Sequence, residues 1–215
     1  MELIWIRHGM TEGNTRQRYI GGRTDEGLCP AGREALRENV AAGLYPRADL
    51  VYVSPMQRCL ETAQIVYPDV PKRIVEGFRE CDFGLFENKN DEELAAESFY
   101  QNWRAKRETA SFPGGEHPED FKRRCRETLL SLTARGEMPE KTAFVVHGGV
   151  IMAVLSGLDE NRGAFYDYYT CNGEGYICRA EQKGGELLLR DCRRFGPHTQ
   201  SGQGNHSETG EGVTV

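Results

Sequence analysis

The chain has 215 residues, of which 38% are hydrophobic and 28% are charged, and its formal net charge is −6. This profile is typical of one globular domain that is long enough to bury a core without disulfides or metals. The acidic balance argues against nucleic acid as a partner, because proteins that bind nucleic acid usually carry a basic surface.

The sequence also favours a cytoplasmic protein that has no membrane partner. The apolar run after Met1 is too short for a signal peptide and is followed by Arg7 and His8. No later stretch approaches the roughly 20 apolar residues that span a bilayer. The seven cysteines are scattered, odd in number and without a C-x-x-C pair. We therefore expect reduced structural thiols.

Four short apolar runs predict β-strands. The first three are continuous rather than alternating, which is typical of strands that are covered on both faces, although a short apolar run alone does not exclude a buried helix. The runs are Leu3–Ile6, Leu50–Val53, Ala143–Val146 and Leu187–Leu189.

Helical spacing occupies the segments between these runs. Leu36, Val40 and Leu44 repeat every four residues, which predicts a face that packs on the core. Ser54 and Pro55 predict that a second helix begins directly after the second strand, with the serine as its N-cap. The apolar stripe of that helix comprises Met56, Cys59, Leu60, Ala63 and Val66. A third helix is expected over 119–134, with Phe121, Cys125, Leu129 and Leu132 facing inward.

Alternating strands and helices indicate an α/β fold with a mainly parallel central sheet. Lys183-Gly184-Gly185 separates two strand-like runs and predicts an antiparallel edge hairpin near the C-terminus. We therefore predict a three-layer α/β/α sandwich over residues 1–196. The segment 197–215 is rich in Gly, Ser, Thr, Gln, His and Glu and is expected to be a disordered tail.

Polar residues follow three of the predicted strands. Arg7 and His8 come after the first strand, Ser54 after the second, and His147 after the strand that ends at Val146. Ligands of open α/β sheets bind beyond the carboxyl ends of the strands. We therefore expect the two histidines and Arg7 to meet in one crevice, together with Arg58, which lies one helical turn past Ser54.

Two arginines and two histidines together suit a phosphoryl group. Guanidinium groups match the geometry of phosphate oxygens, and a neutral imidazole is a nucleophile that can accept a phosphoryl group and pass it to water. Taken singly, a histidine after a strand is more often structural, and Gly9 and Gly148 are ordinary turn residues. The repetition at several strand ends favours a site. A zinc site is the competing interpretation, but no H-x-x-x-H, H-E-x-x-H or C-x-x-C spacing supports it.

Six blocks of the sequence resemble the histidine phosphatase superfamily, also called phosphoglycerate mutase-like. They occur in the family's order and span nearly the whole chain from Ile4 to about Arg190. The blocks are Arg7–Asn14, Gly21–Gly32, Ser54–Ala63, Phe78–Glu87, Phe112–Glu116 and Val145–Gly149.

The resemblance implies a role for each matching residue. His8 would be the nucleophile that becomes phosphohistidine, and Arg7, Arg58 and His147 would surround the phosphoryl oxygens. Glu80 would be the general acid that protonates the leaving oxygen and later helps water attack.

Further expectations rest on the same resemblance. Asn14, Gly21 and Gly148 match substrate-binding positions. Asp82 and Glu87 are rival candidates for the acid, although each is also explained as solvated surface charge. The segment 80–118 is expected to fold over the pocket as a lid that sets specificity, and neither a metal nor a cofactor is implied.

The substrate is a small-molecule phosphomonoester on this interpretation. Cys81–Lys89 is more similar to the phosphatase branch than to the mutase branch, which favours hydrolysis. Ile4–Gly9 and Arg18–Asp25 resemble the α-ribazole phosphatases of cobalamin synthesis. Three alternatives remain: a phosphoglycerate mutase, a broad sugar phosphate phosphatase and an inactive phosphate-binding module. An inactive relative would be expected to have lost at least one catalytic candidate, and all four are present in this chain: His8, Arg58, Glu80 and His147. The sequence leaves the oligomeric state open, a homodimer included.

Overall fold

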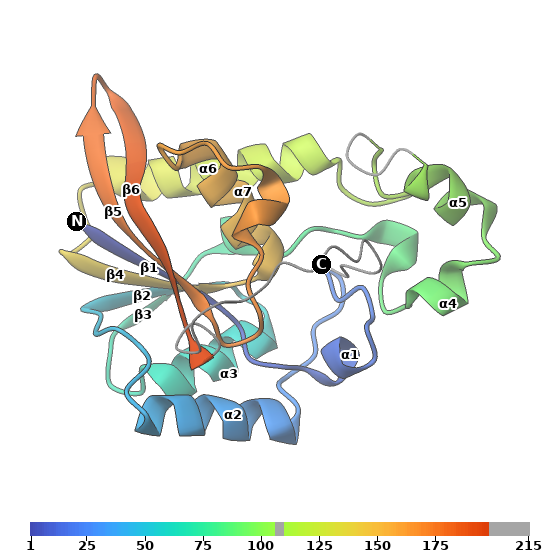
Figure 1. Cartoon of the computed structure of the whole chain (residues 1–215), viewed down its shortest axis with the longest axis horizontal. Helices are drawn as coiled ribbons and strands as arrows, with labels where there is room; N and C mark the ends of the chain where they lie inside the picture. Colours follow the sequence, from blue (N-terminus) through green and yellow to red (C-terminus); the bar gives the residue numbers. More distant parts are fainter. Residues whose placement is uncertain (106–109, 198–215) are drawn as a thin grey trace.

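A mixed six-stranded sheet forms the centre of the computed structural model, which describes residues 1–105 and 110–197. The strand order is β3-β2-β4-β1-β5-β6 (Figure 1). The β1–β4, β2–β4 and β2–β3 pairs are parallel, whereas β5 pairs antiparallel with β1 and with β6. The strands are β1 (Glu2–Arg7), β2 (Leu50–Val53), β3 (Lys72–Ile74), β4 (Lys141–Val146), β5 (Gly175–Lys183) and β6 (Glu186–Phe195). The predicted parallel sheet with a C-terminal hairpin is confirmed.

Helices cover both faces of this sheet. In Figure 1, α2 and α3 lie below the strands, and α6 and α7 lie above them. This arrangement confirms the three-layer α/β/α sandwich. The α-helices are α1 (Glu12–Thr15), α2 (Pro30–Ala41), α3 (Gln57–Val66), α4 (Asp91–Leu94), α5 (Ser98–Arg104), α6 (Pro118–Ala134) and α7 (Gly148–Leu158). Short 3-10 turns span Glu76–Phe78, Gly84–Phe86 and Phe165–Tyr168.

The central strands bury side chains on both faces, as their continuous apolar runs predict. On the α6/α7 face, the Phe144 ring stacks on Trp5 with centroids 4.2 Å apart and on Tyr52 at 5.6 Å. On the opposite face, Ile4 and Val51 belong to a second buried cluster that includes Leu36, Cys59 and Ala63. All seven cysteines are free thiols.

Some local expectations were wrong. Val40 is 39% exposed, and Leu44 lies beyond the end of α2, so only Leu36 of that stripe is buried in the core. Helix α3 begins at Gln57 after Met56, and the Ser54 hydroxyl hydrogen-bonds to His147 Nε2 at 2.7 Å instead of capping the helix. Strand β3 was not predicted, because its three residues form an exposed sheet edge with no apolar run.

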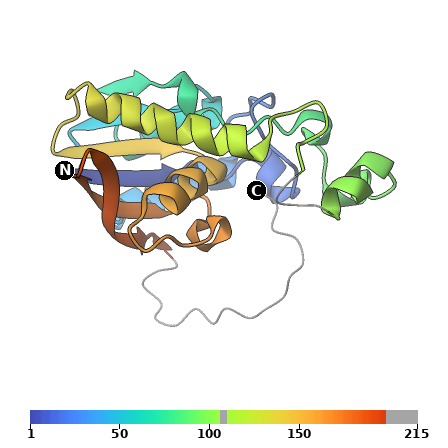
Figure 2. The same cartoon turned by 90° about the horizontal axis from the view of Figure 1, so that it is seen from above.

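A smaller unit projects from one end of the sandwich. Figures 1 and 2 show α4 and α5 standing away from the sheet. They pack on their own aromatic cluster, in which Phe86 contacts Tyr100, Trp103 and Phe112 with centroids 5.1–5.5 Å apart. This unit lies within the segment 80–118, whose role in specificity stays a prediction. Of the predicted tail, residues 198–215 lie outside the described residues.

The first prediction concerns the aromatic stack at the centre of the sheet. Because Phe144 is fully buried between Trp5 and Tyr52, Phe144→Ala should lower the free energy of unfolding by about 3–5 kcal/mol. Urea unfolding followed by circular dichroism measures the change. Leu85→Ala is the control, since that side chain is 52% exposed and its loss should cost less than about 1 kcal/mol. Equal losses in the two variants would contradict this account of the core.

Candidate active site

The two histidines are neighbours because the strands that carry them are neighbours. β1 and β4 pair in parallel with Arg7 opposite Val146, so His8 and His147 leave the same edge of the sheet side by side. The His8 amide donates to Val146 O at 2.9 Å, and the two imidazole rings lie 5.3 Å apart. The predicted meeting of the two strand ends is present in the structure.

A hydrogen bond to the main chain fixes the tautomer of His8. Its Nδ1 lies 2.7 Å from the Gly9 carbonyl oxygen, and because a carbonyl only accepts, Nδ1 carries the proton. The lone pair of a neutral ring is then on Nε2. Burial lowers the pKa of His8 well below its usual value, and the charges of Arg58 and Arg7 lower it further. Near neutral pH the imidazole is therefore uncharged.

Arg58 connects the second histidine to the loop that follows α1. Its Nε donates to His147 Nδ1 at 3.3 Å, while its terminal nitrogens donate to Thr24 O at 2.8 Å and Gly21 O at 3.2 Å. Because His147 Nδ1 accepts this bond, Nε2 carries the proton that is donated to the Ser54 hydroxyl. Burial, followed by the charge of Arg58, lowers the pKa of His147.

Arg7 supplies a buried cationic donor. Its Nη1 donates to Thr170 O at 2.7 Å, whereas its Nε has no acceptor among the residues that the structure describes. A side chain at position 148 would place its Cβ 3.3 Å from the guanidinium carbon, so Gly148 allows Arg7 to lie close to the start of α7. The structure thus places Gly148 against a phosphate-binding candidate.

Glu80 is a buried carboxyl group at the same edge of the sheet. It accepts hydrogen bonds from the Cys81 amide at 2.9 Å and from the Gly149 amide, at the start of α7, at 3.2 Å. Burial raises the pKa of Glu80 despite these bonds and the nearby arginines. A Cβ at position 149 would lie 2.5 Å from Glu80 Oε1, so this approach requires glycine. A carboxyl that keeps its proton is suited to general acid catalysis.

Asp82 and Glu87, the two other candidates for the general acid, are bound to other groups. Glu87 accepts from the amides of Gly21 at 3.1 Å, Arg23 at 3.3 Å and Phe83 at 3.2 Å, and also from the Thr24 hydroxyl. Its interpretation as solvated surface charge was therefore wrong, because it organises the loop at 21–24. Asp82 pairs with Arg23 at 2.8 Å. Glu80 differs from both in being buried.

Asn14 and Gly21 contact residues of the site through hydrogen bonds to their neighbours. Asn14 Oδ1 accepts from the Thr11 amide and from Asn172 Nδ2, both at 3.2 Å. The Gly21 amide is directed to Glu87, and its carbonyl accepts from Arg58. Their roles in substrate binding remain predictions.

Asn172 is a site residue that the sequence did not single out. Its Nδ2 donates to the His8 carbonyl at 3.1 Å, and the adjacent Gly173 amide donates to Arg7 O at 3.1 Å and His8 O at 3.2 Å. The loop that follows the 3-10 turn at Phe165–Tyr168 therefore holds the main chain of the nucleophile. Asn172 and Gly173 have the composition of an ordinary turn, so no local signal distinguished them.

The arrangement can hold a dianion beside a neutral nucleophile and a proton donor. Two guanidinium groups, the histidine pair and the carboxyl of Glu80 are all buried, where electrostatic attraction is stronger than in water. Among the described residues, no group of three or more His, Cys, Asp or Glu side chains is placed to hold a metal ion. Within the same residues, no helix is long and apolar enough to cross a membrane.

The fold is an α/β sandwich whose sheet edge brings two histidines and two arginines together. Residues 3–192 match the family model of the histidine phosphatase superfamily (branch 1), and the chain therefore belongs to that superfamily. The resemblance of the six sequence blocks is confirmed.

Similar proteins include phosphatases and mutases. A crystal structure from Escherichia coli, provisionally described as an α-ribazole-5′-P phosphatase, has a TM-score of 0.76 at 25% identity and covers 88% of this chain and 94% of its own. A phosphoserine phosphatase mutant from Entamoeba histolytica in complex with phosphoserine has a TM-score of 0.71 at 28% identity, covering 89% and 95%. A 2,3-bisphosphoglycerate-dependent phosphoglycerate mutase from Rhizobium etli is 28% identical over 170 residues, 73% of this chain and 79% of that protein.

The second prediction tests Asn172 as a positioning residue. Asn172→Ala removes the side-chain donor to the His8 carbonyl and to Asn14. A misplaced nucleophile should lower kcat for phosphate release about 10- to 100-fold while KM changes little, because the phosphate-binding side chains remain.

The control is Asn161→Ala, which removes a partly buried side-chain bond to Asp159, and it should keep kcat within about twofold. Thermal melts of both variants identify any loss of folding. A rise in KM with unchanged kcat for Asn172→Ala would show that Asn172 does not position the nucleophile.

Proposed function

We propose that this protein is a metal-independent phosphomonoesterase that acts through a phosphohistidine at His8. The observation that carries the proposal is the neutral His8, whose unprotonated Nε2 lies at the same sheet edge as two buried arginines and a carboxyl of raised pKa. Hydrolysis of a small-molecule phosphomonoester is the reaction that these groups support best.

The proposed reaction has two steps in which atoms and charges balance. In the first, Nε2 of His8 forms a bond to phosphorus, the ester P–O bond breaks, and Glu80 gives its proton to the leaving oxygen. In the second, the Glu80 carboxylate takes a proton from water as the water oxygen bonds to phosphorus, and the bond between phosphorus and Nε2 of His8 breaks. Inorganic phosphate leaves, and His8 and Glu80 return to their starting forms.

Arg7 and Arg58 stabilise the charge of the phosphoryl oxygens in both steps. The free Nε of Arg7 is a donor that the oxygens can use, and Arg58 can exchange its bonds to loop carbonyls for charge-assisted bonds to phosphate. His147, which is held by Ser54, would add a further contact. This set needs no metal to offset the charge.

α-Ribazole 5′-phosphate is the specific substrate that we propose first, which would place the protein in cobalamin synthesis. The similarity to the Escherichia coli structure supports it, as do the segments Ile4–Gly9 and Arg18–Asp25. Mutase activity is the second candidate because of the 28% identity to the Rhizobium etli enzyme. The sequence after Glu80 favours hydrolysis over transfer.

The third prediction tests the nucleophile. His8→Ala should lower phosphate release at least about a thousandfold, because both ring nitrogens of the neighbouring His147 are already engaged by Arg58 and Ser54 and cannot replace the nucleophile. Acid-labile, base-stable labelling by a ³²P ester should be present in the wild type and absent in the variant. Wild-type release should continue in EDTA.

The matched control is His117→Asn, which keeps a hydrogen-bond acceptor at the N-cap of α6 and should retain full activity. Phosphate release by His8→Ala at the wild-type rate would remove His8 from the mechanism, and loss of wild-type activity in EDTA would remove metal independence.

The fourth prediction concerns pH and the general acid. Because burial raises the pKa of Glu80, the acid keeps its proton to a higher pH than an ordinary glutamate, and hydrolysis of alkyl phosphates should fall as pH rises through that pKa. It should also fall at low pH, as His8 gains a proton below its lowered pKa.

Glu80→Gln should slow phosphoenzyme formation from an alkyl phosphate about 100- to 10,000-fold and abolish the high-pH decline. The burst of p-nitrophenol from p-nitrophenyl phosphate should be slowed far less, since that leaving group needs no proton. Equal losses for the two esters would transfer the acid role to Asp82 or Glu87.

A further inference from the structure

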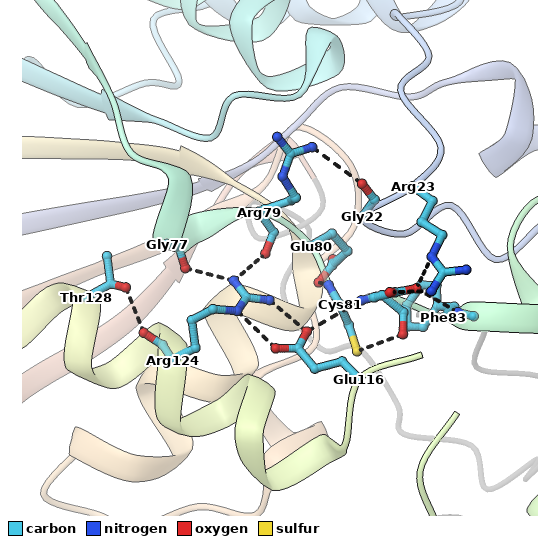
Figure 3. A network of polar contacts seen from close by, with 12 residues as sticks. Gly22, Arg23, Gly77, Arg79, Glu80, Cys81, Phe83, Glu116, Arg124 and Thr128 are labelled. Carbon is cyan, nitrogen blue, oxygen red and sulfur yellow. Dashed lines mark hydrogen bonds and ion pairs between the residues drawn. The ribbon is translucent and has the colours of Figure 1, made fainter. Parts of the chain in front are cut away.

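A cavity of about 470 Å³ adjoins the segment that carries Glu80, and Glu80 is one of the residues that line it. Figure 3 shows Arg124 and Glu116 on one side of this segment and Arg23 on the other. The volume is within the usual range for a small-molecule site. Within the part of the chain that the structure describes, only charged side chains and glycines line the cavity.

The cavity lies where the leaving group of a substrate would be expected, because it adjoins the proposed general acid. A general acid must lie within about 2.6–3.2 Å of the oxygen that it protonates. The rest of the leaving group must therefore occupy space next to Glu80. The cavity provides such space, and His8 is not among the residues that line it.

The cationic side chains of the wall are already matched by carboxylates. Arg23 pairs with Asp82 at 2.8 Å, Arg79 with Glu76 at 3.1 Å, and Arg124 with Glu116 at 2.8 Å. Three positive charges thus face three negative charges when Glu80 carries its proton. A carboxylate on the ligand would find each guanidinium in use and would lie near carboxylate oxygens of the same sign.

Hydroxyl groups suit this wall better than carboxylates or apolar groups do. A hydroxyl accepts from a guanidinium and donates to a carboxylate at the same time, so several hydroxyls can use both halves of each ion pair. An apolar leaving group would displace water from the charged side chains and would not replace the hydrogen bonds that the water makes to them. Among the described residues no aliphatic or aromatic residue lines the cavity, so its apolar surface comes from glycines and from the stems of side chains that end in a charge.

We infer that this cavity binds the leaving group of the substrate and selects an uncharged polyol, such as the sugar ring of a sugar phosphate or riboside 5′-phosphate, over a carboxylate-bearing group. The inference rests on the proposed function, because it takes Glu80 as the donor to the leaving oxygen. It separates the candidate substrates by chemistry, since α-ribazole phosphate and sugar phosphates present hydroxyls there, whereas phosphoserine and phosphoglycerate present a carboxylate.

The fifth prediction is a substrate preference of the full-length protein. Ribose 5-phosphate, phosphoserine, 3-phosphoglycerate and p-nitrophenyl phosphate are compared by kcat/KM for phosphate release. We expect ribose 5-phosphate to exceed both carboxylate-bearing esters by at least about tenfold, the effect of one retained hydrogen bond to a charged group. Equal or greater kcat/KM for phosphoserine or 3-phosphoglycerate would overturn the inference.

A variant of the cavity wall tests the same assignment from the protein side. Arg79→Met removes a donor whose carboxylate partner, Glu76, is 73% exposed, so folding should be retained. The ratio of kcat/KM for ribose 5-phosphate to that for p-nitrophenyl phosphate should fall about tenfold, mainly through KM.

Arg123→Met is the matched control, because Arg123 also pairs with an exposed carboxylate three residues earlier but lies outside the cavity wall. It should keep the ratio within about twofold. An unchanged ratio in Arg79→Met overturns the subsite and leaves the phosphatase mechanism intact. A wild-type protein that hydrolyses none of the four esters overturns the proposed function and the inference with it.

Discussion

The site depends on the parallel pairing of β1 with β4. Arg7 lies opposite Val146 in this register, and the His8 amide continues the ladder with a 2.9 Å bond to Val146 O. A slip of one residue would exchange the two faces of the strand and separate the histidines. The buried side chains on both faces, which include Trp5 and Ile4, oppose such a slip. The core of the sandwich therefore specifies the geometry of the catalytic pair.

Burial both creates the chemistry of the site and makes the site costly to form. Arg58 and His147 are fully buried, and charged groups in such surroundings need partners. Loop carbonyls supply them for Arg58, and Thr170 O does so for Arg7. Because these partners are neutral dipoles, the positive charge is held in place but not cancelled. The same low-dielectric surroundings lower the pKa of His8 and raise that of Glu80, and each shift favours the neutral form that the proposed role of the group uses.

The sequence predicted the parts of the site that follow from local pattern. Apolar runs located the strands, and the positions of His8 and His147 directly after them were enough to expect that the two side chains meet. Contacts between distant segments had no such signal. Asn172 reaches the His8 carbonyl from 164 residues away, from a stretch that has the composition of a simple turn. Ser54 was read as a helix cap because its local context matches one, whereas tertiary packing directs its hydroxyl to His147.

The residues of the proposed mechanism come from two parts of the chain. The sandwich carries His8, Arg7, Arg58 and His147, while Glu80 and most of the cavity wall belong to the segment between β3 and α6. The Gly149 amide, at the start of α7, joins the two parts through its bond to Glu80. A Cβ at position 149 would lie 2.5 Å from Glu80 Oε1, so glycine there lets the main chain of α7 approach the carboxyl and donate to it. Cavity residues such as Arg79 and Asp82 can then be replaced without moving the reacting groups. A fold of this kind can therefore accept different leaving groups with one mechanism.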